Sequence, residues 1–327
     1  MPRALLTGFG PFGSHDVNPT ELIVESFPSL IPIKNPFGRG SSEMSIEKHV
    51  LSVDEHGSSW TANQLASREW DAILHLGLCG ECTQPRIELL AEDALDMRIP
   101  DNSGRQMNGA KISGNGDLKA AVPVKKWGVE DWEVDIELSK DAGRYICNET
   151  YYRTLEALQT HKFAIPCLFL HLPSVEHMSV KEASKLVRRV LAHMLYKPSI
   201  QVAAGIFTSE SGFLAMRRGE NEPKAGKWEF PGGTVERDES PEDALIRELQ
   251  EELSLRVTIV KKAGVWTHTY PFLHVEIHGF LVEAEDLENL QMSVHSEMKW
   301  ISSSEGLNLD WLEADIPIVE DLLKGHY

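Results

Sequence analysis

The sequence has 327 residues, 42% of them hydrophobic and 25% charged, which is typical of a globular protein with two domains. Lys and Arg number 32 and Asp and Glu number 50, so the formal net charge is −18. This acidity argues against long nucleic acid and an anionic membrane surface as partners, because both need a basic face. A nucleotide is not excluded, because a bound metal ion reverses the local sign of charge.

The apolar runs and the cysteines bear on the compartment. No run is long enough to span a membrane, and the N-terminus has no apolar segment of signal-peptide length. Four cysteines are too few for a disulfide framework in a chain of this length. Cys79 and Cys82 could form a redox pair or half of a zinc site, but no second such pair and no nearby pair of histidines accompanies them, so two unpaired loop thiols are expected. We expect a cytoplasmic protein with reduced thiols.

The first part of the chain alternates short apolar runs with amphipathic stretches. Strands are expected at residues 4–9, 48–53, 72–76 and 164–171, and helices at residues 20–26, 61–68, 148–159 and 180–195. This alternation predicts an α/β sandwich with a largely parallel sheet. The last of these helices stops before Pro198, and a new strand begins at residue 200. We therefore expect two domains, 1–197 and 198–327.

The second part contains a candidate metal site on a charged helix. It is expected to hold strands, this helix at 241–253 and a closing helix at 317–323. Ser240 is a strong N-cap for the charged helix. Glu248, Glu251 and Glu252 lie three and four residues apart on one face, where like charges destabilise a helix by roughly 0.2–0.5 kcal/mol per pair. A divalent cation would remove this repulsion, and the alternative is a solvated acidic helix.

The segment around this helix resembles the Nudix box. The matching places are Gly233, Glu239, Arg247, Glu248, Leu249, Glu251, Glu252 and Leu255, while Ser254 stands where the family has glycine. The resemblance implies an α+β Nudix sandwich that cleaves a nucleoside diphosphate linkage by attack of water on phosphorus. It implies that Mg²⁺ or Mn²⁺ is held by the Gly232 carbonyl and by Glu248, Glu251 and Glu252. The last two glutamates are assigned to catalysis, and Glu239 and Arg247 to bracing the helix.

Two flanking segments, 215–218 and 228–233, resemble the MutT group, which covers oxidised-purine triphosphatases and cytidine triphosphate pyrophosphohydrolases. The implied substrate is a nucleoside triphosphate, which is cleaved to monophosphate and pyrophosphate. The resemblance places Arg218 on the phosphate, Phe230 in the base pocket and Asp315 against the base edge. A plain N-cap role for Asp315 before the closing helix is equally open.

One position departs from the MutT group near the end of the chain. The group often has a further glutamate, a metal ligand or base, six residues before the tryptophan of the next strand. Counting back from Trp300 gives Val294, and neither His295 nor Glu297 aligns with that place. The general base is therefore left open.

The first domain contains three separated residues that together allow thiol chemistry. Its opening, Thr-Gly-Phe-Gly-Pro-Phe-Gly at 7–13, is not a phosphate loop, because no lysine follows in the Walker position. Cys147 precedes a predicted helix, where thiols ionise more readily, and His171 ends an apolar strand. With Glu88 they allow a triad in which a carboxylate orients the histidine base. Spacing alone favours the alternative of a buried cysteine, a core histidine and a surface glutamate.

Residues 1–197 resemble pyroglutamyl peptidase I over essentially the whole domain. The matching pieces are the opening at 7–13, Asn18 with Pro19, the run at 98–102, Cys147 with Asn148, and the run at 171–173. The resemblance implies an α/β/α sandwich of the phosphorylase/hydrolase type that needs no cofactor and removes an N-terminal pyroglutamyl residue through a thioester. It places Glu88, Cys147 and His171 on the triad. The substrate-binding positions that it implies are Phe9, Phe12, Asn18 and Arg98.

Three places depart from the peptidase pattern. Residues 78–82 read Leu-Cys-Gly-Glu-Cys where the family usually has Gly-Gly-Arg. Asp93 stands in place of an asparagine, and Arg144 in place of a frequent threonine. These positions border the expected site, so a shift in specificity is expected.

The sequence thus predicts a bifunctional hydrolase whose partners are a nucleoside triphosphate and a pyroglutamyl peptide. In one alternative the first domain is a catalytically weak module for binding or oligomerisation, and a homo-oligomer through this domain is left open. In another alternative the Nudix domain is a nucleotide sensor. The sequence supplies no chemical link between the two reactions.

Overall fold

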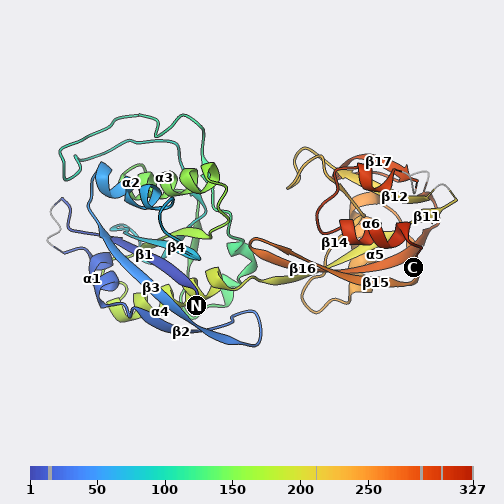
Figure 1. Cartoon of the computed structure of the whole chain (residues 1–327), viewed down its shortest axis with the longest axis horizontal. Helices are drawn as coiled ribbons and strands as arrows, with labels where there is room; N and C mark the ends of the chain where they lie inside the picture. The colour runs from blue at the N-terminus through green and yellow to red at the C-terminus, as the bar shows by residue number, and fades with distance from the viewer. Residues whose placement is uncertain (14–16, 211, 288–289, 303–304, 326–327) are drawn as a thin grey trace. The chain divides into compact units, whose positions relative to one another are not determined.

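The computed structural model describes residues 1–13, 17–210, 212–287, 290–302 and 305–325 (Figure 1). These residues form two compact units, Met1–Pro198 and Ser199–Tyr327. Both units combine helices with strands, as the predicted fold class requires. None of the helices in the described ranges is long and apolar enough to cross a membrane.

The described part of the first unit is built on a seven-stranded sheet in the order β2-β3-β1-β4-β9-β5-β8. The strands are β2 (Leu30–Lys34), β3 (Ser41–Leu51), β1 (Arg3–Phe9), β4 (Ala72–Leu78), β9 (Cys167–Leu172), β5 (Arg86–Glu88) and β8 (Glu137–Ser139). The sheet is largely parallel, as predicted, because β3, β1, β4 and β9 run in one direction. Strands β2 and β5 are antiparallel to their neighbours β3 and β9. A separate two-stranded ladder pairs β6 (Leu90–Ala91) with β7 (Leu118–Lys119).

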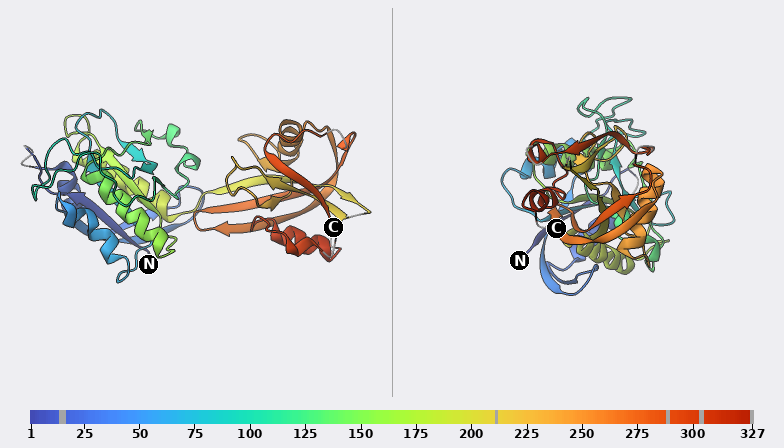
Figure 2. Two further views of the ribbon diagram at one scale, coloured as in Figure 1. Left: turned by 90° about the horizontal axis from the view of Figure 1, so that it is seen from above. Right: turned by 90° about the vertical axis from the view of Figure 1, so that its right-hand side faces the viewer.

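Helices cover both faces of this sheet, which confirms the predicted α/β/α sandwich (Figure 2). Helices α1 (Pro19–Ser26) and α4 (Val180–Leu195) bury Ile23, Val187 and Val190 in the core on one face. Helix α3 (Ile146–Thr160) buries Tyr151 and Leu155 in the core on the other face, next to α2 (Glu55–Gln64). Two short 3₁₀ turns, Val124–Lys126 and Val129–Asp131, contribute to the first core.

Helix α2 begins earlier than the sequence pattern indicates, at Glu55 in place of residue 61. The reason is local capping, because the carboxylate of Asp54 accepts a hydrogen bond from the Gly57 N–H at 2.9 Å. A side chain at Gly57 is also excluded, since a Cβ there would lie 1.9 Å from the carbonyl oxygen of Ser52. Helix α4 has the predicted bounds and starts with a capping box.

The described part of the second unit contains two four-stranded sheets. One has the order β14-β10-β16-β15, and in the other β12 pairs with β11, β13 and β17. Their strands are β10 (Ser199–Ile206), β11 (Thr208–Ser209), β12 (Gly212–Arg218), β13 (Trp228–Glu229), β14 (Gly232–Thr234), β15 (Val257–Tyr270), β16 (Leu273–Ala284) and β17 (His295–Ile301). A short 3₁₀ turn, Gly306–Asn308, follows β17.

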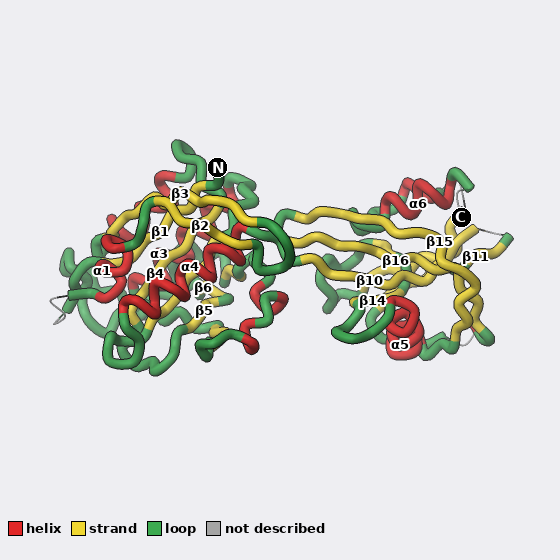
Figure 3. The backbone as a smooth tube through the Cα atoms, turned by 90° about the horizontal axis from the view of Figure 1, so that it is seen from below, coloured by secondary structure: helices red, strands yellow, loops and turns green. Residues whose placement is uncertain are grey.

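Two helices enclose the second unit on opposite sides of strand β10 (Figure 3). Helix α5 (Pro241–Leu253) shares a core with Ala203, and α6 (Ile316–Leu323) shares a core with Ala204. These consecutive strand residues face opposite ways because side chains alternate along a strand. Helix α5 has the predicted bounds, and its apolar stripe of Leu245, Leu249 and Leu253 is fully buried.

Candidate functional sites

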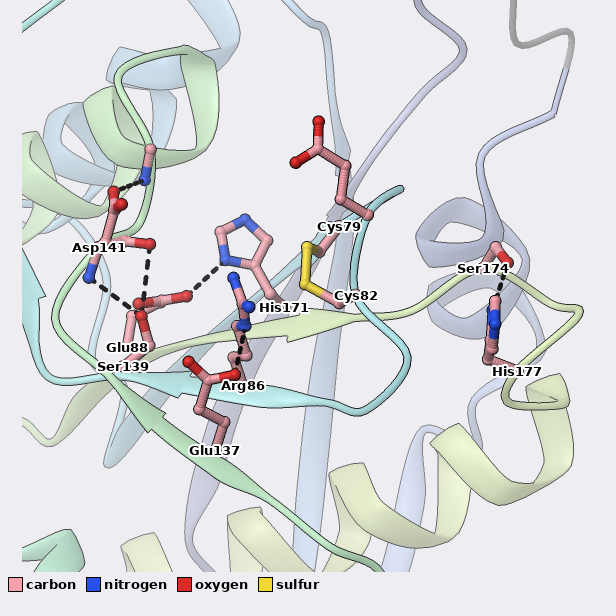
Figure 4. The surroundings of a disulfide bond; sticks show 12 residues. Cys79, Cys82, Arg86, Glu88, Glu137, Ser139, Asp141, His171, Ser174 and His177 are labelled. Atoms are coloured by element: carbon pink, nitrogen blue, oxygen red, sulfur yellow. Dashed lines mark hydrogen bonds and ion pairs between the residues drawn. A yellow bond between two sulfur atoms is a disulfide. The ribbon is translucent and has the colours of Figure 1, made fainter.

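The structure brings Glu88, His171 and Cys147 together at one edge of the first sheet. Nδ1 of His171 lies 2.8 Å from Oε1 of Glu88, and His171 is also hydrogen-bonded to Cys147 (Figure 4 shows the glutamate and the histidine). Glu88 ends strand β5 and His171 lies on its antiparallel neighbour β9, so the pairing of the two strands sets their distance. Cys147 lies in the first turn of α3 and is partly exposed. The arrangement allows proton transfer between a thiol and an imidazole that a carboxylate orients.

Two buried histidines of this unit differ in their electrostatics. Burial alone lowers the pKa of His171, but its hydrogen bonds to Cys147 and Glu88 and their charges outweigh this and raise the pKa to about 9. Burial lowers the pKa of His75 to about 3, and its two ring nitrogens contact Thr7 and Thr154. His75 is a neutral core histidine, whereas the surroundings of His171 stabilise a proton on its ring.

A glycine on the neighbouring strand leaves room for the ring of His171. Gly77 of β4 lies opposite His171 in the sheet. A Cβ on Gly77 would lie 2.9 Å from Cδ2 of His171 and 2.5 Å from the Phe169 ring. The absence of a side chain at this position therefore permits the histidine to reach Glu88.

Two of the proposed substrate residues are aromatic and occupy different environments. Phe9 is almost fully buried in the core, where its ring centroid lies 6.4 Å from that of Phe169. Phe12 is partly exposed, and its ring centroid lies 6.4 Å from that of Tyr145, just before α3. Phe12 is thus close to the helix that carries Cys147. Ring binding by either residue stays a prediction.

The other two proposed substrate residues lie in a buried cap and on the exposed surface. Asn18 is buried, and its side chain caps α1 by accepting from the Thr20 N–H at 3.1 Å. Its amide nitrogen donates to the Gly10 carbonyl at 3.2 Å, so it shapes the glycine-rich opening from within. The side chain of Arg98 is 89% exposed and forms an ion pair with Glu81 at 3.5 Å.

The expectation of two unpaired thiols at Cys79 and Cys82 is wrong, because the structure joins them by a disulfide. A tight turn closes with a hydrogen bond from the Cys82 N–H to the Cys79 carbonyl, and the two Cα atoms lie 5.4 Å apart. That separation is within the range for disulfides. The sequence of the turn alone does not show that the two Cα atoms come this close. The turn follows β4, and the Cys79 N–H binds the carbonyl of Leu172, the residue after His171. Figure 4 shows the disulfide beside His171. Cys147 and Cys167 are free.

In the second unit, helix α5 is fixed at both ends and braced from the side. The hydroxyl of Ser240 accepts from the Asp243 N–H at 3.1 Å, as its predicted N-cap role requires. Ser254 ends the helix with a left-handed φ of 55°, which costs a residue with a side chain about 1–2 kcal/mol. Arg247 donates to both oxygens of Glu239, at 2.9 and 3.0 Å. This pair ties the preceding loop to the helix.

The three glutamates proposed as metal ligands differ in their surroundings. The carboxylate of Glu248 packs on Gly233, where a Cβ would come within 2.2 Å of it. Glu251 is 62% exposed and lies 3.4 Å from Arg247. Oε2 of Glu252 is buried without a hydrogen-bond partner, and burial raises the pKa of this carboxyl to about 7.

The chemistry of this donor set suits a hard divalent cation. In the described ranges, no three His, Cys, Asp or Glu side chains gather in a group that would hold a metal ion. Two features nevertheless suit a metal site built from carboxylates. Oε2 of Glu252 has no hydrogen-bond partner, and the carboxylate of Glu248 packs directly on Gly233. Gly232, the proposed carbonyl ligand, adjoins these residues on β14. Metal binding remains a proposal.

The proposed nucleotide-binding residues lie at the end of β12, just after β13 and just before α6. Arg218 forms an ion pair with Glu229 at 2.5 Å. Phe230 is buried, with its ring stacked 5.4 Å from that of Trp311. Asp315 is buried and accepts from the Phe230 N–H at 3.1 Å, and burial raises its pKa to about 8. Asp315 stands at the N-cap position of α6, as the alternative expects, but its side chain makes no capping bond to the helix.

Comparisons with known proteins match the two units to two different families. The family model for pyroglutamyl peptidase matches residues 2–203, and the model for the NUDIX domain matches residues 199–322. The pyrrolidone-carboxylate peptidase of Deinococcus radiodurans is 29% identical over 227 residues, 66% of this chain and 99% of that protein. The CTP pyrophosphohydrolase of Escherichia coli is 34% identical over 121 residues, 37% of this chain and 89% of that protein.

A solved structure has the fold of the first unit. The pyrrolidone carboxyl peptidase from Thermococcus litoralis matches with a TM-score of 0.53 and 25% identity, covering 60% of this chain and 94% of that chain. The chain belongs to the pyroglutamyl peptidase family and to the Nudix family. Both are hydrolase families, so the two units are a pyroglutamyl peptidase domain and a Nudix domain.

The pyroglutamyl peptidase domain contains a buried ionic network that the sequence did not indicate. Arg105 binds Asp101 at 3.0 Å and the fully buried Glu149 at 2.5 Å. Asp101 belongs to the matched run at 98–102, and Glu149 lies two residues after Cys147 on α3. Arg105 therefore ties this run to α3, the helix that carries Cys147. No local signal was present, because Arg105 and Glu149 are 44 residues apart.

We expect Arg105→Met to destabilise the pyroglutamyl peptidase domain by about 3–5 kcal/mol, because a buried carboxylate loses a partner. It should also lower kcat/KM for a pyroglutamyl amide, because the run at 98–102 is released from α3. Urea unfolding and amide hydrolysis measure the two effects. The matched control is Arg153→Met, since Arg153 also binds Glu149, at 2.7 Å, but has no bond to Asp101 in the described structure. Equal kcat/KM losses in both variants would refute the link.

Proposed function

We propose that this chain is a bifunctional hydrolase with a domain boundary at Lys197. The pyroglutamyl peptidase domain removes N-terminal pyroglutamate from peptides, and the Nudix domain hydrolyses nucleoside triphosphates to monophosphate and pyrophosphate with Mg²⁺ or Mn²⁺. The observation that carries the first activity is the hydrogen-bonded series Glu88, His171 and Cys147. The second is carried by the unpartnered buried oxygen of Glu252 on the braced helix α5.

In the proposed peptidase reaction, Cys147 gives its proton to His171 and its sulfur attacks the pyroglutamyl carbonyl carbon. A carbon–sulfur bond forms and the peptide carbon–nitrogen bond breaks, and His171 returns the proton to the leaving amine. Water then hydrolyses the thioester with His171 as base, and the thiol is restored. Glu88 orients the ring through Nδ1 and stabilises its positive charge.

In the proposed nucleotide reaction, the divalent cation would be held by the carboxylates of Glu248, Glu251 and Glu252 and by the Gly232 carbonyl. That cation supplies charge neutralisation on the phosphates and a more acidic water. Arg218 binds a phosphate oxygen, and Glu229 holds its guanidinium in place. Water adds to phosphorus as the bond to the leaving phosphate oxygen breaks, which releases monophosphate and pyrophosphate.

We infer that a cytidine nucleotide is the preferred substrate. The pKa of Asp315 near 8 keeps this carboxyl protonated at neutral pH, so it both donates and accepts a hydrogen bond. Cytosine offers the complementary pair, an acceptor at N3 and the N4 amine as donor. The name of the Escherichia coli relative, a CTP pyrophosphohydrolase, supports the same class.

The full chain tests both activities in parallel assays. Release of a fluorophore from a pyroglutamyl amide should continue in a metal chelator and stop after alkylation with iodoacetamide. Pyrophosphate release from a panel of nucleoside triphosphates, including those of cytidine and oxidised guanine, should stop in the metal chelator and continue after alkylation. No fluorophore release would favour a binding module for the first domain, and no pyrophosphate release would favour a nucleotide sensor.

We expect cytidine triphosphate hydrolysis by the wild type to fall as pH rises through about 8, because Asp315 loses the proton that it donates to N3. Below that pKa the donor is present and the rate is retained. In Asp315→Asn the amide donates and accepts at every pH, so kcat/KM should lose this dependence while staying within about tenfold of the wild type at neutral pH. pH profiles of the two proteins check this. Identical profiles would refute base recognition by Asp315.

A further inference from the structure

A bulge in the Nudix domain determines which residue of β17 faces the nucleotide site. Arg217 of β12 lies opposite Glu297, but the next residue, Arg218, lies opposite His295, so Ser296 is the additional residue. A shift of one residue turns a side chain to the other face of a sheet. The bulge therefore places His295 directly across from the proposed phosphate-binding arginine, as bulges beside active sites often do.

One carboxylate connects these two side chains. Glu229 binds Nε2 of His295 through Oε1 at 3.1 Å and Nη1 of Arg218 through Oε2 at 2.5 Å. The His295 side chain is only 1% exposed. A carboxylate accepts and does not donate, so the hydrogen of the neutral ring is on Nε2 and Nδ1 is an acceptor.

Two buried acceptors in this domain have no partner. In the described part of the Nudix domain, the buried side-chain polar atoms without a hydrogen bond are Oε2 of Glu252 and Nδ1 of His295. The His295 side chain lies near enough to Glu252 for the two groups to interact. Ser293 anchors the same segment to α5, because its N–H and hydroxyl both bind the Glu252 carbonyl at 3.0 Å. Buried acceptors such as Oε2 of Glu252 and Nδ1 of His295 normally receive a hydrogen bond. A single water molecule can donate to both, because it has two hydrogens.

We propose that His295 is a positioning residue of the Nudix site, where Glu229 orients its ring so that Nδ1 and Glu252 together hold one water molecule beside α5. This inference rests on the proposed nucleotide hydrolysis. It fills the place of the glutamate that Val294 replaces. Glu297, the other candidate, pairs with the exposed Arg217 at 3.3 Å, away from this site. The structure thus shows that His295 faces the proposed site and Glu297 does not, which the sequence did not indicate.

The test compares three variants of the full chain. In His295→Asn, the side-chain amide oxygen lies near the position of Nδ1, and in His295→Gln the amide nitrogen lies near that of Nε2. We expect His295→Ala to lower kcat about 10- to 100-fold, with less than a threefold change in KM for the nucleotide. The kcat of His295→Asn should be at least tenfold higher than that of His295→Ala, whereas the kcat of His295→Gln should stay as low as that of His295→Ala.

A second readout needs no turnover. The Mn²⁺ dissociation constant, measured by electron paramagnetic resonance, should rise about tenfold in His295→Ala and recover in His295→Asn. The control is His274→Ala, an exposed histidine bound to Thr269, which should change neither quantity. An unchanged kcat and Mn²⁺ constant in His295→Ala, or recovery with Gln only, would overturn the inference. A wild type without nucleotide hydrolysis defeats the proposed function, while the Mn²⁺ series still tests His295.

Discussion

Replacing Cys147 with alanine is expected to abolish pyroglutamate release, with a loss on the order of 10⁵- to 10⁶-fold, while nucleotide hydrolysis keeps its wild-type rate. The reason is that the covalent route needs a nucleophile, and removal of one member of a triad removes the route. Initial rates with a fluorogenic pyroglutamyl amide and with a nucleoside triphosphate, measured on the same preparation, check both parts. The unchanged nucleotide rate shows that the Nudix domain is intact in this preparation, and circular dichroism matching the wild type would show that the peptidase domain is folded.

The matched control for Cys147→Ala is Cys167→Ala, which removes the other free thiol. Cys167 is buried at the start of β9, and burial raises its pKa, so its thiol is neutral and inaccessible. We expect this variant to keep peptidase activity and iodoacetamide to label Cys147 alone. Glu88→Gln should cost about 10⁴-fold, because His171 keeps its place but loses its oriented charge partner. Substantial activity in Cys147→Ala would contradict the assigned nucleophile.

Helices whose first and last residues are marked by capping residues or by the ends of an apolar pattern could be predicted from the sequence. Helices α4 and α5 have the predicted bounds, because each starts at a serine N-cap and carries a stripe of buried apolar residues. Helix α2 was displaced in the prediction, because Asp54, the residue that starts it, lies outside the apolar pattern. Short strands such as β5 could not be predicted, because three residues acquire their structure only by pairing with β9.

The chemistry-bearing residues were recognisable one by one, but their mutual geometry was not. Glu88 and His171 meet because β5 runs antiparallel to β9, which is a property of the sheet and not of either sequence segment. His295 was left unaligned because it is not six residues before Trp300, and the bulge that decides the direction of its side chain is invisible in the sequence. The Cys79–Cys82 disulfide was missed because composition indicates only whether disulfides are expected, and not whether a turn brings two thiols together.

Replacing Glu252 with glutamine is expected to lower nucleotide hydrolysis about 10³-fold and to leave the peptidase untouched, which corresponds to a loss of about 4 kcal/mol. Glutamine keeps the size of the side chain but removes the charge that the cation requires. Pyrophosphate release with saturating Mg²⁺ measures the rate. Glu242→Gln is the control, because Glu242 lies in the exposed first turn of the same helix. It should retain wild-type activity.

Stability with and without metal tests the same assignment independently of turnover. Glu252 is a half-buried carboxylate, with Oε2 out of reach of solvent, that experiences repulsion from Glu248 and Glu229. Glu252→Gln should therefore be at least as stable as the wild type in a metal chelator, because it removes a charge that burial disfavours. Adding Mg²⁺ should stabilise the wild type and Glu242→Gln but not Glu252→Gln, since only a protein that binds the ion gains stability from it. Equal Mg²⁺-dependent shifts in all three proteins would show that the metal binds elsewhere, and α5 would then be a solvated acidic helix.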